Sequence, residues 1–195
     1  MTGYTVRPLE VATWDAFADL VERNGGVFGG CWCMGFHPKN TSEETAAVPK
    51  REQKLARVRA GEAHAALVFD GEEAVGWCQF GSPDELPRIK HRRRYEEQPP
   101  DRPDWRITCF YVDKHRRRQG IADAALAGAL DLIADAGGGG CEAITEDTSG
   151  REVQGRFLFT ASLQLFERYG FARERQVGKH AWIVRKRVAP ATAAT

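Results

Sequence analysis

The sequence predicts an α/β protein with a mixed sheet and helices on both faces. Short apolar runs of strand length alternate along the chain with apolar residues at helical spacing. One unit, residues 105–145, runs strand, turn, helix and strand, which implies parallel pairing with a right-handed crossover. The runs 64–69 and 74–80, joined by Asp70-Gly71, instead predict an antiparallel hairpin.

Composition narrows the kind of protein. The chain has 195 residues, of which 42% are apolar and 28% charged, and its net charge is +1. We expect one domain over residues 1–188, followed by a disordered tail at 189–195, and no general polyanion binding. No apolar run is long enough for a signal peptide or a membrane span, so we expect a cytoplasmic protein without a membrane partner. An odd count of five cysteines fits reduced thiols in that compartment.

The other elements follow from spacing and from glycine and proline punctuation. The first part of the chain predicts a strand at 4–9, a helix from Thr13 to about Arg23, a glycine-rich loop at 25–30 and an apolar segment without period at 31–36. A long polar helix then begins at Ser42, with Glu43 and Glu44 in its first turn, and ends at Ala60. The last part predicts a helix at 160–168 and strands at 171–177 and 180–187. Residues 81–104 hold five prolines and break the pattern. We therefore treat 81–104 as an inserted loop.

The turn inside the central unit predicts an anion site. Strand 105–112 runs into a basic turn that closes at Gly120, and a helix over 120–136 begins at once. The N–H groups at a helix start have no internal acceptor, and the helix dipole and the arginines 116–118 favour the same negative charge. Gly120 lets a ligand approach the backbone. We expect a phosphate here, at the carboxyl end of the strand.

This order of elements resembles the GNAT N-acetyltransferase superfamily. The match rests on Arg117-x-x-Gly120-x-Ala122 after an apolar strand and on the helix at 162–171, which ends in Gly-Phe. It covers about residues 62–187. The resemblance implies a GNAT-like, mostly antiparallel sheet with a central parallel pair of splayed strands. It also implies an enzyme, an acetyl-CoA-dependent N-acetyltransferase with acetyl-CoA as cosubstrate.

The resemblance also implies where acetyl-CoA binds. The pyrophosphate would sit on the N–H groups of residues 117–122. The pantetheine arm would bond the main chain near Phe110 and Val112, and the thioester would lie where the two parallel strands separate. The expected cofactor-binding residues are Phe110, Tyr111, Val112, Arg117, Arg118, Gln119, Gly120, Ile121, Ala122 and Phe166.

The acid and the base of the transfer depart from the family pattern. The amine must lose a proton before it attacks, and family members often protonate the CoA thiolate with a tyrosine. Here Phe166 stands at the tyrosine position and Arg106 at the position of the usual glutamate. The replacement candidates for catalysis are Glu142, Glu146 and Ser162. The alternatives are salt-bridged carboxylates and, for Ser162, a hydroxyl that bonds its own backbone.

The acceptor side falls on the segment without period. In the family, the region between the first two helices lines the acceptor pocket, and the alternative is a buried plug beneath the second helix. The expected substrate-binding residues are Trp32, Cys33, Met34 and Phe36. We expect an amine of a small molecule or peptide as the acceptor. Direct transfer is favoured because no cysteine has a convincing base partner.

Other functions stay open. Phe166 and Arg106 would suit a CoA-binding module without catalysis. The basic run 90–94 would suit a nucleic-acid-interacting protein, although its acidic neighbours favour a solvated loop or a lid and we expect no nucleic-acid partner. Cys31-x-Cys33 with His37 suggests zinc but lacks the spacing and the second ligand pair of a structural zinc site, so no metal is expected. A homodimer is allowed.

Overall fold

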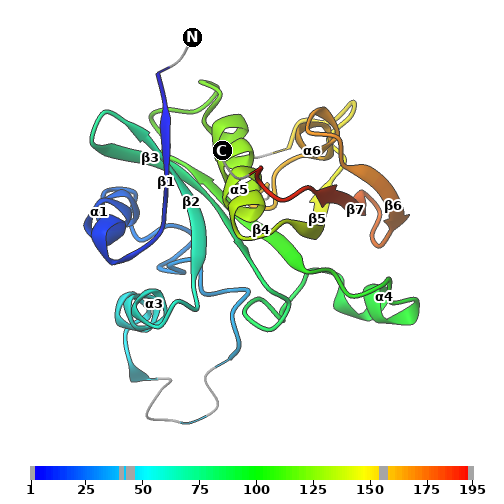
Figure 1. Ribbon diagram of the computed structural model, residues 1–195, viewed down its shortest axis with the longest axis horizontal. Helices are drawn as coiled ribbons and strands as arrows, with labels where there is room; N and C mark the ends of the chain where they lie inside the picture. The colour runs from blue at the N-terminus through cyan, green and yellow to red at the C-terminus, as the bar shows by residue number, and fades with distance from the viewer. Residues whose placement is uncertain (1–2, 40–41, 43–46, 154–157, 193–195) are drawn as a thin grey trace.

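The computed structural model describes residues 3–39, 42, 47–153 and 158–192, and it centres on a seven-stranded sheet of order β1-β2-β3-β4-β5-β7-β6 (Figure 1). The strands are β1 (Thr5–Pro8), β2 (His64–Asp70), β3 (Glu73–Gly81), β4 (Trp105–Val112), β5 (Gly139–Glu146), β6 (Ala172–Gln176) and β7 (Ala181–Val188). Neighbouring strands are antiparallel except β4 and β5, which are parallel. The mixed, mostly antiparallel sheet that the sequence predicts is therefore confirmed.

Helices cover both faces of this sheet (Figure 1). The helices are η1 (Val11–Thr13), α1 (Trp14–Arg23), α3 (Lys50–Arg59), α4 (Arg92–Glu97), α5 (Ile121–Asp135) and α6 (Leu163–Arg168). Apolar side chains of α5 and α6 share one core cluster, and those of α1 and α3 share another. No helix among the described residues has the length and apolar character needed to cross a membrane.

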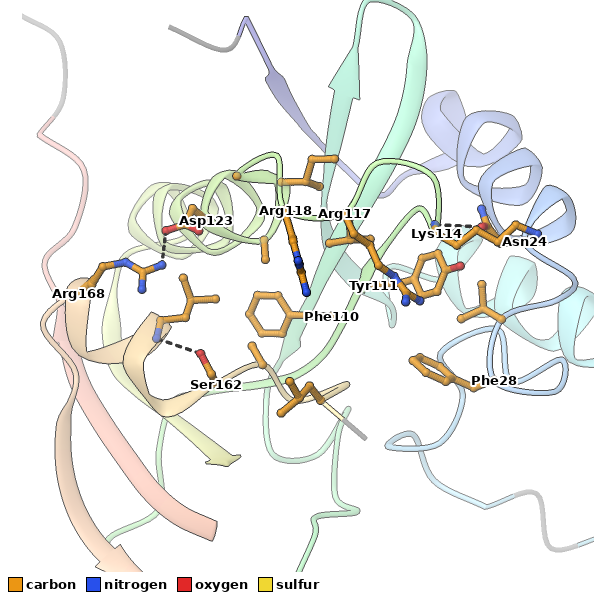
Figure 2. A pocket seen from close by; sticks show the side chains of 18 residues that line it. Asn24, Phe28, Phe110, Tyr111, Lys114, Arg117, Arg118, Asp123, Ser162 and Arg168 are labelled. Carbon is orange, nitrogen blue, oxygen red and sulfur yellow. Dashed lines mark hydrogen bonds and ion pairs between the residues drawn. The ribbon is translucent and has the colours of Figure 1, made fainter. Parts of the chain in front are cut away.

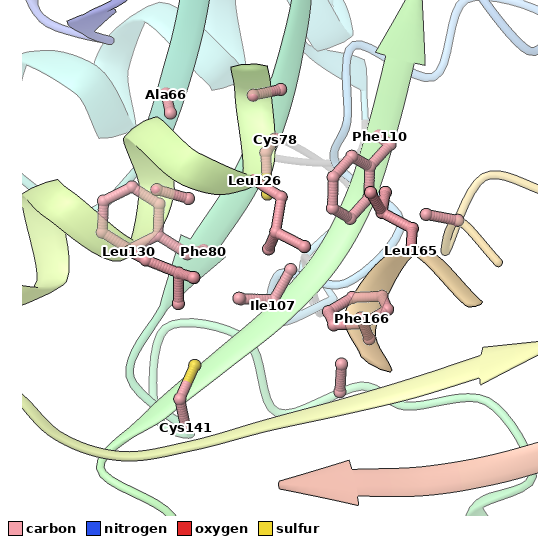
Figure 3. Close-up of a cluster of buried hydrophobic side chains, with 14 of the residues drawn as sticks. Ala66, Cys78, Phe80, Ile107, Phe110, Leu126, Leu130, Cys141, Leu165 and Phe166 are labelled. Atoms are coloured by element: carbon pink, nitrogen blue, oxygen red, sulfur yellow. The ribbon is translucent and has the colours of Figure 1, made fainter. Parts of the chain in front are cut away.

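The residues of β2 alternate between the two cores. Ala66 and Val68 pack in the cluster of α5, whereas Leu67 and Phe69 pack in the cluster of α1 and α3. All four are buried. Figure 3 shows the α5 side, where Leu126 and other helix residues lie over β3 and β4. Each fully buried valine, leucine or phenylalanine side chain stabilises the fold by roughly 1.5–3 kcal/mol, so packing on both faces stabilises the sheet.

The central parallel pair separates soon after it begins. β4 and β5 are in register only from Trp105 to Ile107. Beyond that point residues 158–162 enter between the two strands, where the Phe110 N–H donates to the Phe159 carbonyl oxygen at 2.6 Å. The splay is the position at which the sheet opens toward a ligand.

One helix prediction and one loop prediction were wrong in extent. The long helix expected from Ser42 is interrupted in the described chain. Ala47 is helical, but Val48 and Pro49 are not, and α3 begins at Lys50, because Pro49 has extended backbone and cannot lie inside a helix. Its predicted first turn at Glu43 and Glu44 lies outside the described residues. The segment 81–104 is not all loop, since it contains α4.

Contacts between residues far apart in the sequence hold α4 and the start of the C-terminal segment in place. The Arg175 guanidinium donates to the carbonyl oxygens of Arg94, Tyr95 and Gln98, which fastens α4 to β6. The predicted tail is bound at its start, where the Ala191 N–H donates to the carbonyl oxygen of Ala134 at 2.9 Å.

Candidate active site

A cavity of about 600 Å³ opens between the end of β4, the start of α5 and the segment that leads into α6 (Figure 2). All of the predicted cofactor-binding residues line it except Gln119 and Phe166. Ser162 lines it as well. The structure therefore gathers most of the residues that the resemblance named around one space.

Asp113 shapes the turn at the mouth of this cavity. Its carboxylate accepts from the His115 N–H at 3.0 Å and from the Arg23 guanidinium at 2.9 Å, and its own carbonyl accepts from the Arg116 N–H. Burial raises the pKa of Asp113, but the hydrogen bonds from His115, Asn24 and Arg23 outweigh burial and hold the pKa below its usual value. The turn is therefore fixed by a charged, internally bonded residue.

The helix start forms the floor of the cradle. Gly120 has φ +81°, and a Cβ there would meet no heavy atom within 4 Å, so the backbone faces open space. The first helical bond runs from the Ala124 N–H to the Gly120 carbonyl. Within the described chain, no acceptor is bonded to the N–H groups of Gly120, Ile121 and Ala122. These donors fit a diphosphate.

The arginines of the turn divide between two roles. Arg117 and Arg118 line the cavity and have no carboxylate partner among residues that the structure describes. Arg116 turns away and pairs with Asp70 at 2.6 Å and Glu73 at 3.3 Å on the β2–β3 hairpin. Two unpaired guanidinium groups thus remain for the phosphates, rather than the three that the sequence suggests.

With respect to the residues that the structure describes, the main chain of β4 leaves the Val112 N–H free for a pantetheine arm. The Asp113 N–H donates to Val75 on β3, so strand alternation directs the Val112 N–H to the opposite, cavity side. The Phe110 N–H points the same way but donates to the Phe159 carbonyl. The contact expected at Phe110 is therefore already taken by the protein.

Three predicted residues serve the fold around the cavity. Phe166 is fully buried and packs edge-on against Phe110, with ring centroids 5.9 Å apart, so it supports the cavity wall from behind. The Gln119 side chain accepts from the Tyr4 hydroxyl. Ser162 caps α6, where its Oγ accepts from the Leu165 N–H at 3.3 Å. Neither Phe166 nor Gln119 belongs to the cavity lining, so contact of these two residues with acetyl-CoA stays a prediction.

Glu142 is enclosed by structural partners. Its two carboxylate oxygens accept from the Tyr95 hydroxyl at 3.0 and 3.1 Å, and Arg185 lies 3.0 Å away. Arg106, at the position of the usual glutamate, lies 3.6 Å from the same carboxylate. Burial and the adjacent Glu142 charge raise the pKa of Tyr95. This arrangement favours the salt-bridged alternative for Glu142.

Glu146 and the basic residues of the run 90–94 form ion pairs with opposite charges. Glu146 pairs with Lys90 at 3.0 Å, and the Lys90 ammonium lies 4.8 Å from the centre of the Phe159 ring. The arginines of α4 pair with Glu96 and Glu97 of the same helix. The positive charge that a nucleic acid would require is therefore largely compensated.

A second cavity of about 520 Å³ adjoins the first, and the Phe28 ring lines both. Cys33 and Phe36 lie on its wall, as does Cys109 of β4. The other two predicted substrate-binding residues are in the core. Trp32 stacks on Trp14 at 5.9 Å, and Met34 is buried in the same cluster. Met34 also lines a smaller cavity of about 240 Å³ that shares Cys31, Gly35 and Arg88 with the second one. The structure therefore brings two of the four predicted residues to the second cavity and a third to its neighbour.

A buried polar chain lies behind Cys33, and the sequence analysis did not identify it. The Cys33 thiol donates to Gln79 Oε1 at 3.0 Å, and Gln79 Nε2 donates to His37 Nε2 at 2.8 Å. Lys54 of α3 donates to the same His37 nitrogen at 3.1 Å. Cys33, His37, Gln79 and Lys54 are all buried. Lys54 stands one turn before the buried Val58, so a lysine on the apolar face of a polar helix was the available signal.

The titratable groups of this hydrogen-bonded chain have strongly shifted pKa values. Burial and the adjacent Lys54 lower the pKa of His37 to about 2, and burial lowers the pKa of Lys54. Burial raises the pKa of Cys33, but hydrogen bonds from Cys109 and Trp77 and the charge of Lys54 outweigh burial and lower it. In the described chain the Cys33 thiol bonds the Gln79 amide and not a base, and His37 and Lys54 lie beyond that amide, so the preference for direct transfer stays a prediction.

Comparisons with known proteins agree with this geometry. The family model described as "Acetyltransferase (GNAT) family" matches residues 32–171. A Corynebacterium glutamicum structure, titled as histone acetyltransferase HPA2 and related acetyltransferase, is 19% identical with a TM-score of 0.54 over 100% of both chains. Comparison with curated protein sequences gives no match.

Two further solved structures carry the cosubstrate or its product. The YncA structure from Salmonella typhimurium with acetyl-CoA is 16% identical, has a TM-score of 0.52, and covers 97% of this chain and 96% of its own. The PaiA N-acetyltransferase from Thermoplasma acidophilum with coenzyme A is 12% identical, has a TM-score of 0.51, and covers 95% and 99%. Because the family model spans more than half of the sequence, and the fold and cradle agree with it, this chain belongs to the GNAT acetyltransferase family and uses acetyl-CoA as its cosubstrate.

Proposed function

We propose that this protein transfers the acetyl group of acetyl-CoA directly to an amine of a small molecule or peptide. The observation that carries the proposal is the cradle, in which the N–H groups of Gly120, Ile121 and Ala122 and the side chains of Arg117 and Arg118 lack protein partners in the described chain. Donors of this kind bind a diphosphate. Acetyl-CoA supplies a reactive thioester, and the residues of this chain bind and orient it.

The two cavities fit the two substrates. The cradle lies in the first, and the second begins on the other side of Phe28, so an acceptor there would reach the end of the pantetheine arm. The rings of Phe28, Phe36 and Phe159 line the second cavity. Its size and aromatic lining favour a small apolar or aromatic amine, or the end of a peptide, over a large polar acceptor.

A screen of amines by mass spectrometry tests this function. The purified protein is incubated with acetyl-CoA and pools of small amines, amino acids and short peptides. We expect at least one acceptor to gain the mass of one acetyl group while CoA thiol is released. The Gly120→Glu variant is the control for background acetylation, because a carboxylate in the cradle repels the diphosphate.

The same screen separates the proposal from its alternative. If no amine is acetylated and no thiol is released although calorimetry shows CoA binding, the protein is a CoA-binding module rather than a transferase. The departures at Phe166 and Arg106 are the reason to make this distinction by experiment.

A further inference from the structure

We propose that Cys33 is a catalytic residue of this enzyme, whose thiolate accepts the proton of the acceptor amine, and that Lys54 is a positioning residue that balances its charge. The inference rests on the proposed transfer to an amine and adds the group that activates that amine. None of the residues considered for the base from the sequence lies on the second cavity, whereas Cys33 does.

The backbone presents Cys33 to the cavity. Cys33 has φ +57° and the preceding Trp32 has φ +50°, two consecutive left-handed residues that are not glycine. Such residues cost of order 1–3 kcal/mol each and persist only where surrounding contacts enforce them. Here the stacking of Trp32 on Trp14 fixes one side of the turn. Cys33 consequently stands at the wall of the second cavity with Cys109 of β4, and its thiol is bonded to Gln79.

Both protonation states of Cys33 have partners. The thiol form donates to Gln79 Oε1 at 3.0 Å. The thiolate form is stabilised by the Cys109 thiol and by the indole N–H of Trp77. That indole N–H is buried and has no hydrogen-bond acceptor in the described part of the chain, so it is available to a thiolate at Cys33. A group that gains and loses a proton in each turnover needs partners in both states, and this site provides them.

Lys54 supplies the compensating charge. Its side chain is 1% exposed and forms no ion pair with a carboxylate among the described residues. An isolated buried ammonium is costly, and a nearby thiolate reduces that cost. The other charged groups around it are Glu85, which is bonded to His64, and Arg57, which opposes the ammonium form.

His37 connects Lys54 to the rest of the chain as a neutral acceptor. Its Nε2 accepts from both Lys54 and Gln79, so the ring proton resides on Nδ1. Because Gln79 also accepts a hydrogen bond from the Cys33 thiol, the chain of hydrogen bonds runs without interruption from Cys33 to α3.

The proposed step conserves atoms and electrons. Cys33 thiolate takes one proton from the ammonium form of the acceptor and becomes a thiol. The freed nitrogen lone pair forms the C–N bond to the acetyl carbon, the C–S bond breaks, and its electron pair remains on the CoA sulfur. The second nitrogen proton passes to that sulfur, and Cys33 then returns its proton to water.

Titration of the thiol tests the proposal without acetyl-CoA or acceptor. The ultraviolet absorbance of thiolate is followed against pH in the wild type, in Cys33→Ser, and in Lys54→Met, which keeps the length and removes the charge. We expect Cys33 to titrate below the value of about 8.5 for a free cysteine, and at least about one pH unit higher in Lys54→Met. A midpoint above 8.5, or no change in Lys54→Met, would overturn it.

Cys141, which does not belong to the hydrogen-bonded chain of Cys33, provides the control. Burial raises the pKa of Cys141 to about 12, and this residue packs in the other core, so Cys141→Ala should leave the titration unchanged. Because the measurement needs no turnover, its result is independent of whether the proposed function holds.

Turnover tests the role itself. With the best amine from the screen, Cys33→Ser and Cys33→Ala should lower kcat/KM by about 10²–10⁴-fold, the usual range for a lost general base. CoA affinity by calorimetry should stay within about twofold of the wild type, and the acidic limb of the pH–rate profile should disappear. An unaltered profile would overturn the role. Silence of the wild type on every amine would remove both the function and this role.

Intact-mass analysis after an acid quench, with acetyl-CoA and no amine, provides the last discrimination. We expect no acetyl group on Cys33. A stable acetyl adduct there would instead make Cys33 a nucleophile and would replace the proton-acceptor role.

Discussion

At the scale of single residues, Gly120 has the most direct effect on ligand binding. We expect Gly120→Glu to abolish measurable CoA binding, a loss of at least about 100-fold or 2.7 kcal/mol, because the new carboxylate would lie among the donors of the cradle. Calorimetry of the folded variant measures this. Gly61→Glu is the matched control, since Gly61 also has positive φ and open space around it but lies outside the cavity. Unchanged affinity in Gly120→Glu would contradict the cradle.

Glu142 is the residue where fold and chemistry compete for one carboxylate. We expect Glu142→Gln to lower the free energy of unfolding by roughly 2–4 kcal/mol, because it leaves Arg106 without its charge partner and removes one of the two partners of Arg185. The second partner of Arg185, Glu174 at 3.1 Å, and the partial exposure of Arg185 reduce the effect. Urea unfolding measures the loss. Glu96→Gln, in an exposed pair, should change stability by less than about 0.5 kcal/mol. Full stability with depressed turnover would restore Glu142 as a catalytic candidate.

At the scale of elements, the close packing of α5 on β1 depends on Gly128. A Cβ at this position would collide with the Val6 side chain. We therefore expect Gly128→Ala to destabilise the protein by about 1–3 kcal/mol by overpacking, although alanine favours a helix by about 1 kcal/mol. Thermal unfolding measures the change. The double variant with Val6→Ala should recover most of the loss, and failure to recover would show that the collision is not the cause.

Element prediction from the sequence succeeded where the signal was local. The strand expected at 105–112 coincides with β4, and the helix expected at 120–136 differs from α5 by one residue at each end. α4 was missed because its sequence is a charged run within a proline-rich segment. Contacts with Arg175, about eighty residues later in the chain, hold it in place. No local pattern carries that information.

At the scale of the whole molecule, the buried His37 links stability to pH. Its pKa is about 2 in the fold, against about 6.5 in an unfolded chain. Below about pH 6.5 the unfolded state therefore binds a proton at His37 that the folded state does not bind. The stabilisation is complete above pH 6.5 and declines as the pH falls, by up to about 1.4 kcal/mol per unit. Urea unfolding between pH 7.5 and 5 measures this slope, which should be smaller in His37→Gln.

His64 acts in the opposite direction. The hydrogen bond to Glu85 at 2.6 Å raises its pKa, so its stabilisation is present at low pH and is lost as the pH rises. The comparison of wild type with His37→Gln isolates the His37 contribution because His64 is common to both. Equal slopes in the two proteins would contradict the assignment of His37.

The candidate site also has one part that the local sequence predicts and another part that it does not predict. The cradle could be predicted because one strand, one turn and one helix start supply it within a dozen residues. The chain from Cys33 through Gln79 and His37 to Lys54 joins two loop residues, β3 and α3, and only the folded sheet brings them together. Prediction from the sequence considered Cys33 and His37 for zinc because their spacing was the only relation visible before folding.

The sheet order has a consequence for how this protein is made. β7, the last strand of the chain, lies between β5 and β6. While the chain is still on the ribosome, every residue of the cradle has been synthesised but β5 has an open edge, and unpaired edges recruit other strands. A chain truncated before β7 would thus carry a complete CoA-binding sequence on a body prone to aggregate.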